Sequence, residues 1–343
     1  MKRRALGTTG LAVTELGFGG APLGNLFRPL ADEPARATLA AAKASGFGYF
    51  DTAPFYGFGL SERRLGDALR GGAFVISSKV GRLLRPVGRP IGEDEVRHGY
   101  ATPMPFEPVF DYSYDAVMRS YEESLQRLGL ARIDLLYIHD IGRMTHGDGN
   151  AVHMAGLTSG GGLKALEELR AGGAIAGFGL GVNEVAACLE VMAHARLDAL
   201  LLAGRYTLLE QAPLDALFPA CAAAGTAIVI GGPFNSGILA TGAKAGGTFN
   251  YEAAPGDVIA RVAAIEAVCD AHGVPLAAAA LQFPLAHSLV ASVIPGLDAP
   301  GRVEQTVTLY RHKIPAALWQ DLRAEKLIRA DAPLPIKGSG HDR

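Results

Sequence analysis

The sequence predicts an α/β protein with an eight-unit (β/α)8 barrel that follows an N-terminal β-hairpin. Short apolar runs typical of buried strands alternate with helical patterns along most of the 343 residues, and this alternation favours a parallel sheet with crossover helices. The chain has room for eight strand–helix units, the number that closes a TIM barrel. Because no linker rich in Pro, Gly or Ser divides it, we expect one domain over 1–343 with its core at about 6–330.

The expected elements follow one another in a regular order. A hairpin is predicted at Leu6–Thr9 and Ala12–Gly17, around a Thr-Gly turn. Barrel strands are then predicted by short apolar runs, at Thr14–Phe18, Gly48–Thr52, Ala73–Lys79, Ile133–His139, Ala174–Gly181, Ala199–Leu202, Thr226–Ile230 and Leu289–Pro295. Helices are predicted between and after them, at Pro34–Ser45, Ser61–Arg70, Tyr114–Leu128, Leu163–Ala171, Glu184–Ala193, Pro213–Ala224, Gly256–His272, Pro275–Ala286, Arg302–Leu309 and Ala316–Ile328.

Composition and charge argue against several classes of partner. The net charge is −2 and no long basic run exists, so nucleic acid is not an expected partner. The basic N-terminus lacks the apolar segment of a signal peptide, and no apolar run is long enough to cross a bilayer. The three cysteines have no metal-binding spacing and are expected to be reduced, buried thiols of a cytoplasmic protein; they are Cys188, Cys221 and Cys269.

Four polar side chains lie at or just beyond the ends of expected strands. Asp51 ends one strand and Tyr56 lies in the following turn, while Lys79 and His139 end two others. In a (β/α)8 barrel, catalytic groups lie on the rim formed by the carboxyl ends of the strands. Each residue alone is more often a cap, a packed ring, a solvated cation or a structural histidine. Their joint placement on one rim predicts a site for proton transfer.

These four groups can cooperate in one reaction. A free phenol has a pKa of about 10, and we expect the Lys79 ammonium to lower the pKa of Tyr56. Asp51 would hold Lys79 protonated, and His139 would position a substrate hydroxyl or carbonyl. Tyr56 then acts as general base when an alcohol is oxidised, or as general acid when a carbonyl is reduced. The hydride needs a separate carrier, which implies a nicotinamide cofactor.

Residues 50–57, Phe-Asp-Thr-Ala-Pro-Phe-Tyr-Gly, and 61–66, Ser-Glu-Arg-Arg-Leu-Gly, closely resemble the signature of the aldo-keto reductases. Segments 138–140, 179–183 and 293–296 match later blocks of that family in order, so the resemblance covers Leu6 to about Leu309. It implies a TIM barrel that uses NAD or NADP without a metal. It also implies a catalytic tetrad, namely Asp51, Tyr56, Lys79 and His139.

The resemblance further implies where the cofactor binds. Asn183 is the expected partner of the nicotinamide carboxamide. The pyrophosphate is expected after the seventh strand, at Gly232, Phe234, Ser236 and Gly237. Beyond the last strand, where NADP-preferring relatives carry more cations, only Arg302 remains and Asp298 adds a negative charge. We therefore expect NAD to be preferred over NADP.

Two positions depart from the family pattern. Ala203 stands where many relatives have a Gln that contacts the carboxamide, and Gly231 stands where many have a Tyr that stacks on the nicotinamide. Asn183 must therefore hold more of the cofactor ring by itself. Gly177-Phe-Gly-Leu-Gly181 invites a dinucleotide interpretation but lacks the full G-x-G-x-x-G spacing, so we interpret it as a closely packed strand.

Within the family, segments 105–114, 202–211 and 231–239 resemble the subgroup that oxidises aldoses, such as L-fucose or D-threo-aldoses, and pyridoxal. The expected function is NAD(P)-dependent oxidation of an aldose at C1 to its lactone, with Tyr56 as general base. The expected partner is a small-molecule substrate, and the sequence does not predict the oligomeric state. Alternatives within the family are pyridoxal 4-dehydrogenase activity or aldehyde and ketone reduction. Two alternatives outside it are a lyase that forms a Schiff base at Lys79 and a cofactor-binding subunit without turnover.

Two long stretches, 82–114 and 141–162, interrupt the alternation of strands and helices. Long loops without structure of their own often form lids or binding walls, and both follow strands that carry expected site residues. Polar residues on the rim could bind sugar hydroxyls, in particular Arg28, Arg82, Asp140 and Asn235. The histidines and aspartates of 139–153 have no metal-ligand spacing, so no metal is expected.

Overall fold

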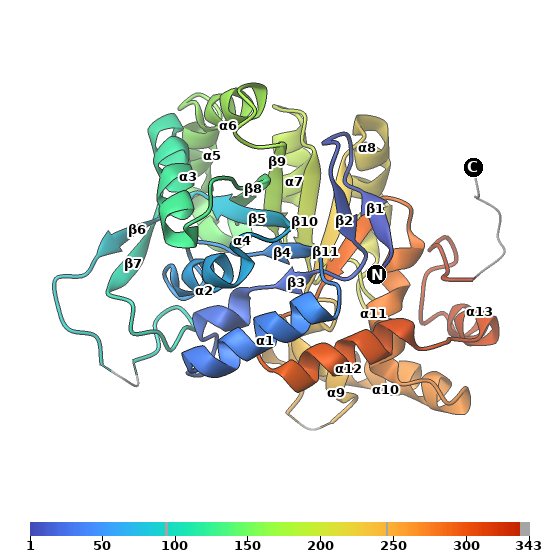
Figure 1. The fold of residues 1–343 in the computed structure, drawn as a ribbon. Helices are drawn as coiled ribbons and strands as arrows, with labels where there is room; N and C mark the ends of the chain where they lie inside the picture. Colours follow the sequence, from blue (N-terminus) through green and yellow to red (C-terminus); the bar gives the residue numbers. More distant parts are fainter. Residues whose placement is uncertain (93–94, 245, 337–343) are drawn as a thin grey trace.

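A computed structural model describes residues 1–92, 95–244 and 246–336. Its central sheet has eight parallel strands, and bridges from Leu16 to Val293 and from Gly19 to Gly296 join the two edge strands. The sheet is therefore a closed barrel with helices outside it, as predicted (Figure 1). In spatial order its strands are β3 (Phe18–Gly19), β4 (Tyr49–Asp51), β5 (Val75–Val80), β8 (Leu135–His139), β9 (Gly177–Val182), β10 (Ala199–Ala203), β11 (Ala227–Gly231) and β14 (Val290–Ile294).

The helices cover the outside of the barrel because each has an apolar face at helical spacing. On the helix at 114–128, for example, Val117, Tyr121 and Leu128 are all buried. All ten predicted helices exist, at α1 (Asp32–Ala44), α2 (Leu60–Leu69), α3 (Tyr114–Leu128), α6 (Gly162–Ala171), α7 (Val185–Met192), α8 (Leu217–Ala224), α10 (Gly256–Ala271), α11 (Leu276–Gln282), α12 (Pro300–Arg311) and α13 (Ala316–Ala324). The predicted helix Pro275–Ala286 is shorter than expected, because Pro284 cannot donate a helical hydrogen bond and a 3-10 turn at Phe283–Ala286 replaces the last part.

Side chains alternate between the inside of the barrel and the layer under the helices. Along β8, Leu135 and Tyr137 belong to the inner cluster, whereas Leu136 and Ile138 pack in the outer one. This is the period of two that a strand imposes. At the amino end of the barrel, Leu6 and Val13 join the inner cluster. The hairpin of β1 (Arg3–Ala5) and β2 (Ala12–Thr14) therefore closes that end, while the carboxyl end stays open for a site.

Both long insertions have secondary structure, which the sequence did not predict. Within 82–114, β6 (Arg82–Pro86) pairs antiparallel with β7 (Phe106–Phe110), and this hairpin projects away from the barrel in Figure 1. Within 141–162 lie two helices, α4 (Arg143–His146) and α5 (Asn150–Leu157). The interpretation of these stretches as loops without structure was wrong: β6 has no long apolar run, and α5 has only eight residues, so neither leaves a periodic signal.

Several short elements lie between β11 and α10, beginning with a 3-10 turn at Asn235–Gly237. The others are α9 (Ile238–Thr241) and a small hairpin of β12 (Thr248–Phe249) and β13 (Glu252–Ala253). Among the described residues no single helix is long and apolar enough to cross a membrane. Taken together, α10 and the segment Leu276–Ala286 have the length and composition of a membrane span, but the two are bent by 102° relative to each other.

Candidate active site

Strand periodicity brings three of the four expected residues together. Asp51, Lys79 and His139 all occupy inward positions at the carboxyl ends of β4, β5 and β8, which are neighbours in the sheet. Lys79 Nζ donates to Asp51 Oδ2 over 2.6 Å and to the Thr52 carbonyl over 2.9 Å. Both side chains of this ion pair are almost fully buried. Gly181 faces them from β9, where a Cβ atom would stand 3.2 Å from Lys79 Cε.

Tyr56 comes from the loop after β4 and completes the group. Its ring lies 4.6 Å from Lys79 Nζ and, edge to face, 5.8 Å from the ring of His139. The loop is fixed by a close backbone approach, because a Cβ at Gly24 would lie 2.4 Å from the Tyr56 carbonyl carbon. The four residues predicted from sequence therefore meet on one rim.

The pKa of Tyr56 is raised, whereas the sequence led us to expect a lowered pKa. Burial raises the pKa of Tyr56 well above its usual value, and the carboxylate of Asp51 raises it further. The expectation that Lys79 makes this phenol acidic is wrong, because the charge of Lys79 is already matched by Asp51 at 2.6 Å. Tyr56 is therefore a protonated phenol at neutral pH, ready to donate a hydrogen bond or a proton.

The other members of the group are affected by burial as well. Burial lowers the pKa of His139 well below its usual value, and the cations of Arg82 and Lys79 add to this effect. His139 is therefore a neutral imidazole. Burial raises the pKa of Asp51 while Lys79 and Ser77 oppose the shift, and burial lowers the pKa of Lys79 while Asp51 opposes it. Proton transfer at this site is thus expected from the phenol, with the imidazole as a neutral hydrogen-bonding group.

A cavity of about 350 Å³ opens above these groups. Tyr56, Lys79 and His139 form part of its wall, and Asn183 lies on the same wall. Several aromatic side chains that sequence reasoning missed complete it, namely Phe27, Phe55, His98, Tyr100 and Tyr251. They come from four different loops, and no periodic pattern in the sequence marks them. A cavity of this kind, lined by aromatic and aliphatic side chains with a few polar groups, suits a small organic substrate.

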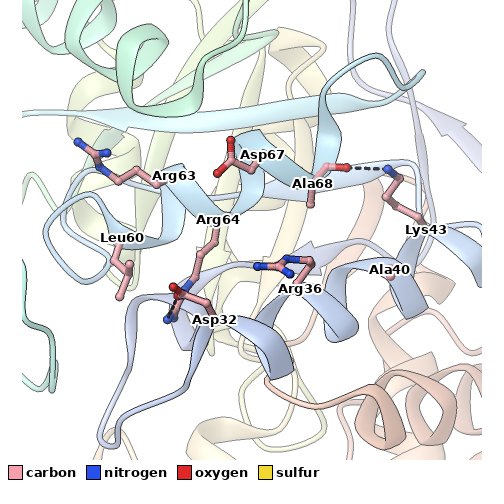
Figure 2. Close-up of a pocket in the computed structure, with 9 residues that line it drawn as sticks. All are labelled: Asp32, Arg36, Ala40, Lys43, Leu60, Arg63, Arg64, Asp67 and Ala68. Carbon is pink, nitrogen blue, oxygen red and sulfur yellow. Dashed lines mark hydrogen bonds and ion pairs between the residues drawn. The ribbon is translucent and has the colours of Figure 1, made fainter.

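Phe27 of the cavity wall lies on a loop that Arg64 holds in place by hydrogen bonds. The guanidinium of Arg64, on α2, donates to the carbonyls of Leu23 and Leu30 and to the side chains of Asn25 and Asp32. These bonds tie the loop that contains Phe27 to the outside of the barrel. Figure 2 shows Arg64 directed at Asp32 in a groove of about 610 Å³ between α1 and α2, whereas the neighbouring Arg63 points away.

The floor of the cavity fits the ring of a nicotinamide cofactor. Gly181 and Ala203 line it with no bulky side chain, and the Asn183 amide stands beside them. The Asn183 carbonyl accepts from Arg205 Nε over 2.8 Å, and Arg205 Nη1 donates to Asn250 on the β12–β13 turn. Small side chains and an amide on one cavity wall are the chemistry that a flat, amide-bearing ring requires.

The expected pyrophosphate segment lies directly after β11. Of its members, Gly237 N–H donates to the Phe234 carbonyl over 3.0 Å, and the Ser236 hydroxyl accepts from Tyr251 N–H over 3.0 Å. The Gly237 amide and the Ser236 hydroxyl are thus already used within the loop. Asn235, expected to bind sugar hydroxyls, instead donates to the Gly204 carbonyl and accepts from Thr207.

Asp298 lies after the last strand, in the segment expected to bind the adenosine part of the cofactor, and it forms two ion pairs there. This carboxylate pairs with Arg28 Nη2 at 2.5 Å and with Arg302 Nε at 3.1 Å. Arg302 stands in the first turn of α12, where it was expected to contact the cofactor, but its charge is matched by Asp298. Arg28 also belongs to this ion pair and does not line the cavity, contrary to the suggestion that it binds sugar hydroxyls.

Comparison with known proteins agrees with this geometry. The model of the aldo/keto reductase family matches residues 15–325. Pyridoxal 4-dehydrogenase of Microbacterium luteolum is 48% identical over 95% of this chain and 98% of its own length, and D-threo-aldose 1-dehydrogenase of a Pseudomonas species is 42% identical over 94% and 97%. The structure of an aldo-keto reductase of Bacillus halodurans (AKR11C1, holo form), 26% identical, covers 96% of this chain and 97% of its own with a TM-score of 0.71.

The match therefore extends over most of the chain in sequence and over nearly all of it in structure. Members of this family use NAD(P)H, and the two relatives named above are dehydrogenases. With this length of match and the barrel rim described here, the chain belongs to the aldo/keto reductase family and is an oxidoreductase acting on CH–OH groups.

Proposed function

We propose that the chain oxidises an aldose, in its cyclic hemiacetal form, at C1 to the lactone. One observation carries the proposal: the phenol of Tyr56 and the neutral imidazole of His139 face one cavity, with the Lys79–Asp51 pair directly beneath them. The 42% identity to a D-threo-aldose 1-dehydrogenase supports the substrate class.

Each residue has a distinct role in this proposal. His139 donates a hydrogen bond to the oxygen on C1 and holds it at the phenol. Tyr56 takes the hydroxyl proton during oxidation, or gives it back during reduction. Asp51 holds the Lys79 ammonium in place, 4.6 Å from the centre of the Tyr56 ring. A bound nicotinamide would supply the acceptor for the hydride of C1.

The raised pKa of Tyr56 gives the proposal a pH signature. Oxidation needs the phenolate and reduction needs the phenol. We therefore expect the rate of oxidation to keep rising from neutral into alkaline pH, while the rate of reduction stays high at neutral pH. Initial rates in both directions from pH 6 to 10 check this, and an oxidation rate that is flat over this range would contradict the assignment of Tyr56.

We infer that NAD is the preferred cofactor. Asp298 matches the charge of Arg302 and adds a carboxylate where a 2′-phosphate would lie, which disfavours NADP. Asp298→Ala should therefore lower the KM for NADP several-fold and leave the KM for NAD nearly unchanged. Asp270→Ala, an exposed change on α10, serves as the charge-matched control.

Pyridoxal is the second candidate substrate, and one feature favours it. The cavity wall is rich in aromatic rings, among them Phe27, Tyr100 and Tyr251, and such rings pack well against a planar pyridine. The relative with 48% identity is named for this activity. The lyase alternative is disfavoured, because Lys79 Nζ already donates to Asp51 and Thr52 and is a poor nucleophile as an ammonium.

A steady-state panel tests these proposals together. Reduced nicotinamide is measured with L-fucose, other aldoses and pyridoxal, each with NAD and with NADP. A higher turnover rate with aldoses than with pyridoxal supports the aldose dehydrogenase activity. A higher turnover rate with pyridoxal supports the pyridoxal dehydrogenase activity. Tyr56→Phe should lower kcat by about 10²- to 10⁴-fold with unchanged affinity for the cofactor. Silence of the whole panel would remove both candidates and leave simple aldehyde reduction or binding without turnover.

A further inference from the structure

Asp140, the residue after His139, has an unusual backbone. Successive strand residues point to opposite faces, so an inward His139 predicts an outward Asp140. Instead Asp140 takes a left-handed φ of 46°, and its N–H donates to the Gly181 carbonyl over 3.0 Å. This turn places Asp140 Oδ2 only 3.5 Å from His139 Nε2. A non-glycine residue in this region is strained, and such strain often occurs at functional sites.

A buried cation holds this carboxylate in place. Arg82 Nη2 donates to Asp140 Oδ2, and the Arg82 side chain is only 7% exposed. The guanidinium carbon lies 4.0 Å from the centre of the Phe55 ring and 5.0 Å from that of Phe110. Burial raises the pKa of Asp140, and the charge of Arg82 opposes that rise. Because the guanidinium is stacked and paired, it also fixes the carboxylate in place.

The free side of the carboxylate faces the cavity. Asp140 lines the cavity wall and its side chain is 23% exposed. In the part of the chain that the structure describes, no hydrogen bond reaches its second oxygen, Oδ1. An ionised carboxylate only accepts hydrogen bonds. Whatever binds here must therefore bring a donor.

We propose that Asp140 is a substrate-binding residue that selects molecules with a hydroxyl on the carbon next to the reacting one. This rests on the function proposed above for the same site. His139 Nε2 holds the oxygen on the reacting carbon, and Asp140, 3.5 Å away, accepts from the neighbouring hydroxyl. A substrate without that hydroxyl displaces water from the carboxylate and returns no hydrogen bond, which is how a polar site rejects a deoxy analogue.

A purely structural role makes a different prediction. If the Arg82–Asp140 pair only fastens the β6–β7 hairpin to the barrel, its loss should affect all substrates alike. If Asp140 binds the hydroxyl, its loss should affect only substrates that carry one. The ratio of kcat/KM for a matched pair of substrates separates the two roles, because a general loss of folded or active enzyme cancels in the ratio.

The experiment uses two such pairs in the full-length enzyme. One is lactaldehyde against propanal in the direction of reduction, and the other is an aldose against its 2-deoxy form in the direction of oxidation. Asp140→Gly removes the carboxylate and suits the left-handed backbone, although it leaves the buried Arg82 without its partner; the ratio of kcat/KM corrects for enzyme that does not fold. Asp140→Asn keeps a neutral acceptor. Asp148→Asn removes an exposed charge from the same rim segment, outside the cavity, and is the control.

We expect the wild type and Asp148→Asn to favour the hydroxylated member by about 10- to 100-fold in kcat/KM. In Asp140→Gly, the ratio of kcat/KM between the two substrates should fall close to the ratio of their intrinsic reactivities. The ratio for Asp140→Asn should lie between those of the wild type and Asp140→Gly. A wild type that treats both members alike, or an Asp140→Gly enzyme that keeps the full preference, overturns the proposal, as does silence towards both pairs. If aldoses are silent while lactaldehyde shows the preference and Asp140→Gly loses it, the proposed aldose activity fails and the role of Asp140 stands.

Discussion

At the scale of single residues, the carboxylate of Asp51 is satisfied on both sides. Lys79 binds Oδ2, and the Ser77 hydroxyl donates to Oδ1 over 2.7 Å. The Tyr49 hydroxyl lies 2.9 Å from Ser77 Oγ and 3.2 Å from the Tyr137 hydroxyl. A chain of buried polar groups thus runs from the rim into the barrel. Since the second carboxylate oxygen orients the first, Ser77 is a positioning residue for Lys79.

Ser77→Ala should remove a hydrogen bond that favours the ionised form and so raise the pKa of Asp51 further. We expect the acid limb of the kcat profile to shift to higher pH and kcat at neutral pH to fall about 10-fold. The measurement is the pH profile of kcat. Ser78→Ala is the matched control, because Ser78 faces outward and donates to Glu62; it should change stability without moving the limb. An unmoved limb in Ser77→Ala would show that Ser77 only packs.

At the scale of elements, the rim loops are fixed by a few polar clamps. Arg64 is one of them, and its side chain is only 11% exposed while it holds the loop that contains Phe27. A second clamp starts at Tyr112, whose hydroxyl donates to the His139 carbonyl over 2.7 Å and lies 3.0 Å from His146 Nε2 on α4. Such clamps replace the long apolar faces that these short elements lack.

Arg64→Met should leave two carbonyls and the Asn25 side chain without their donor. We expect the enzyme to lose about 2 kcal/mol of unfolding free energy and KM for the substrate to rise several-fold while kcat changes little, because Phe27 is no longer held in place. Urea unfolding and steady-state kinetics measure the two effects. Arg63→Met, one residue earlier and exposed, should change neither (Figure 2). Equal kinetics in both variants would exclude a role for the clamp in substrate binding.

The clamp at His146 should depend on pH. Burial lowers the pKa of His146 to about 4, and the neighbouring His153 and Arg82 add to the shift. The ring of His153 lies 3.9 Å from it. When residues 143–157 detach from the barrel, His146 is exposed and binds a proton with an ordinary pKa near 6.5. The packed form of this segment is therefore fully stable above pH 6.5 and loses stability as the pH falls towards 4.

Limited proteolysis within 143–157 should therefore accelerate between pH 7 and pH 5, after correction for the protease's own pH dependence. His146→Gln keeps a hydrogen-bonding side chain that does not titrate, and should remove most of the change. Cleavage that accelerates equally in both proteins would assign the effect to another group.

At the scale of the whole molecule, the chain closes on itself at the amino end of the barrel. The guanidinium of Arg4, on β1, donates to the carbonyls of Leu285 and Val290 and to Glu15 Oε1 over 2.6 Å. Tyr310 on α12 donates to the other oxygen of Glu15, also over 2.6 Å. The first and last parts of the barrel are thus joined through one buried carboxylate.

Glu15→Gln should destabilise the whole barrel. Burial raises the pKa of Glu15, but Tyr310 and Arg4 outweigh it, so the net pKa is lowered. The stabilisation is therefore present above the ordinary pKa of a glutamate and is lost as the pH falls through the lower folded value. We expect a loss of about 2 kcal/mol at neutral pH and a flatter fall of stability towards acid. Urea unfolding at pH 7 and pH 4 tests this, and equal losses at both pH values would contradict it.

The sequence by itself determined the barrel and most of the group on its rim. Strand composition and the period of two place Asp51, Lys79 and His139 inward at neighbouring strand ends, and these are local properties that a single strand carries. The same local signals predicted ten helices and an N-terminal hairpin, but the first arm was misplaced: the strand is Arg3–Ala5, and Leu6–Thr9 belongs to the connection between the two strands. They could not predict β6 or α5, because those elements depend on contacts with the barrel rather than on their own periodicity.

Tertiary structure alone decided the electrostatics and the shape of the cavity. The pKa of Tyr56 depends on how deeply the phenol is buried and on the Asp51–Lys79 pair, so the acidity expected from a nearby cation is not found. The left-handed turn at Asp140 sends its carboxylate into the cavity against the strand pattern. The burial of a side chain and the electric charges around it depend on residues that lie far apart in the chain. A local sequence pattern therefore does not predict them.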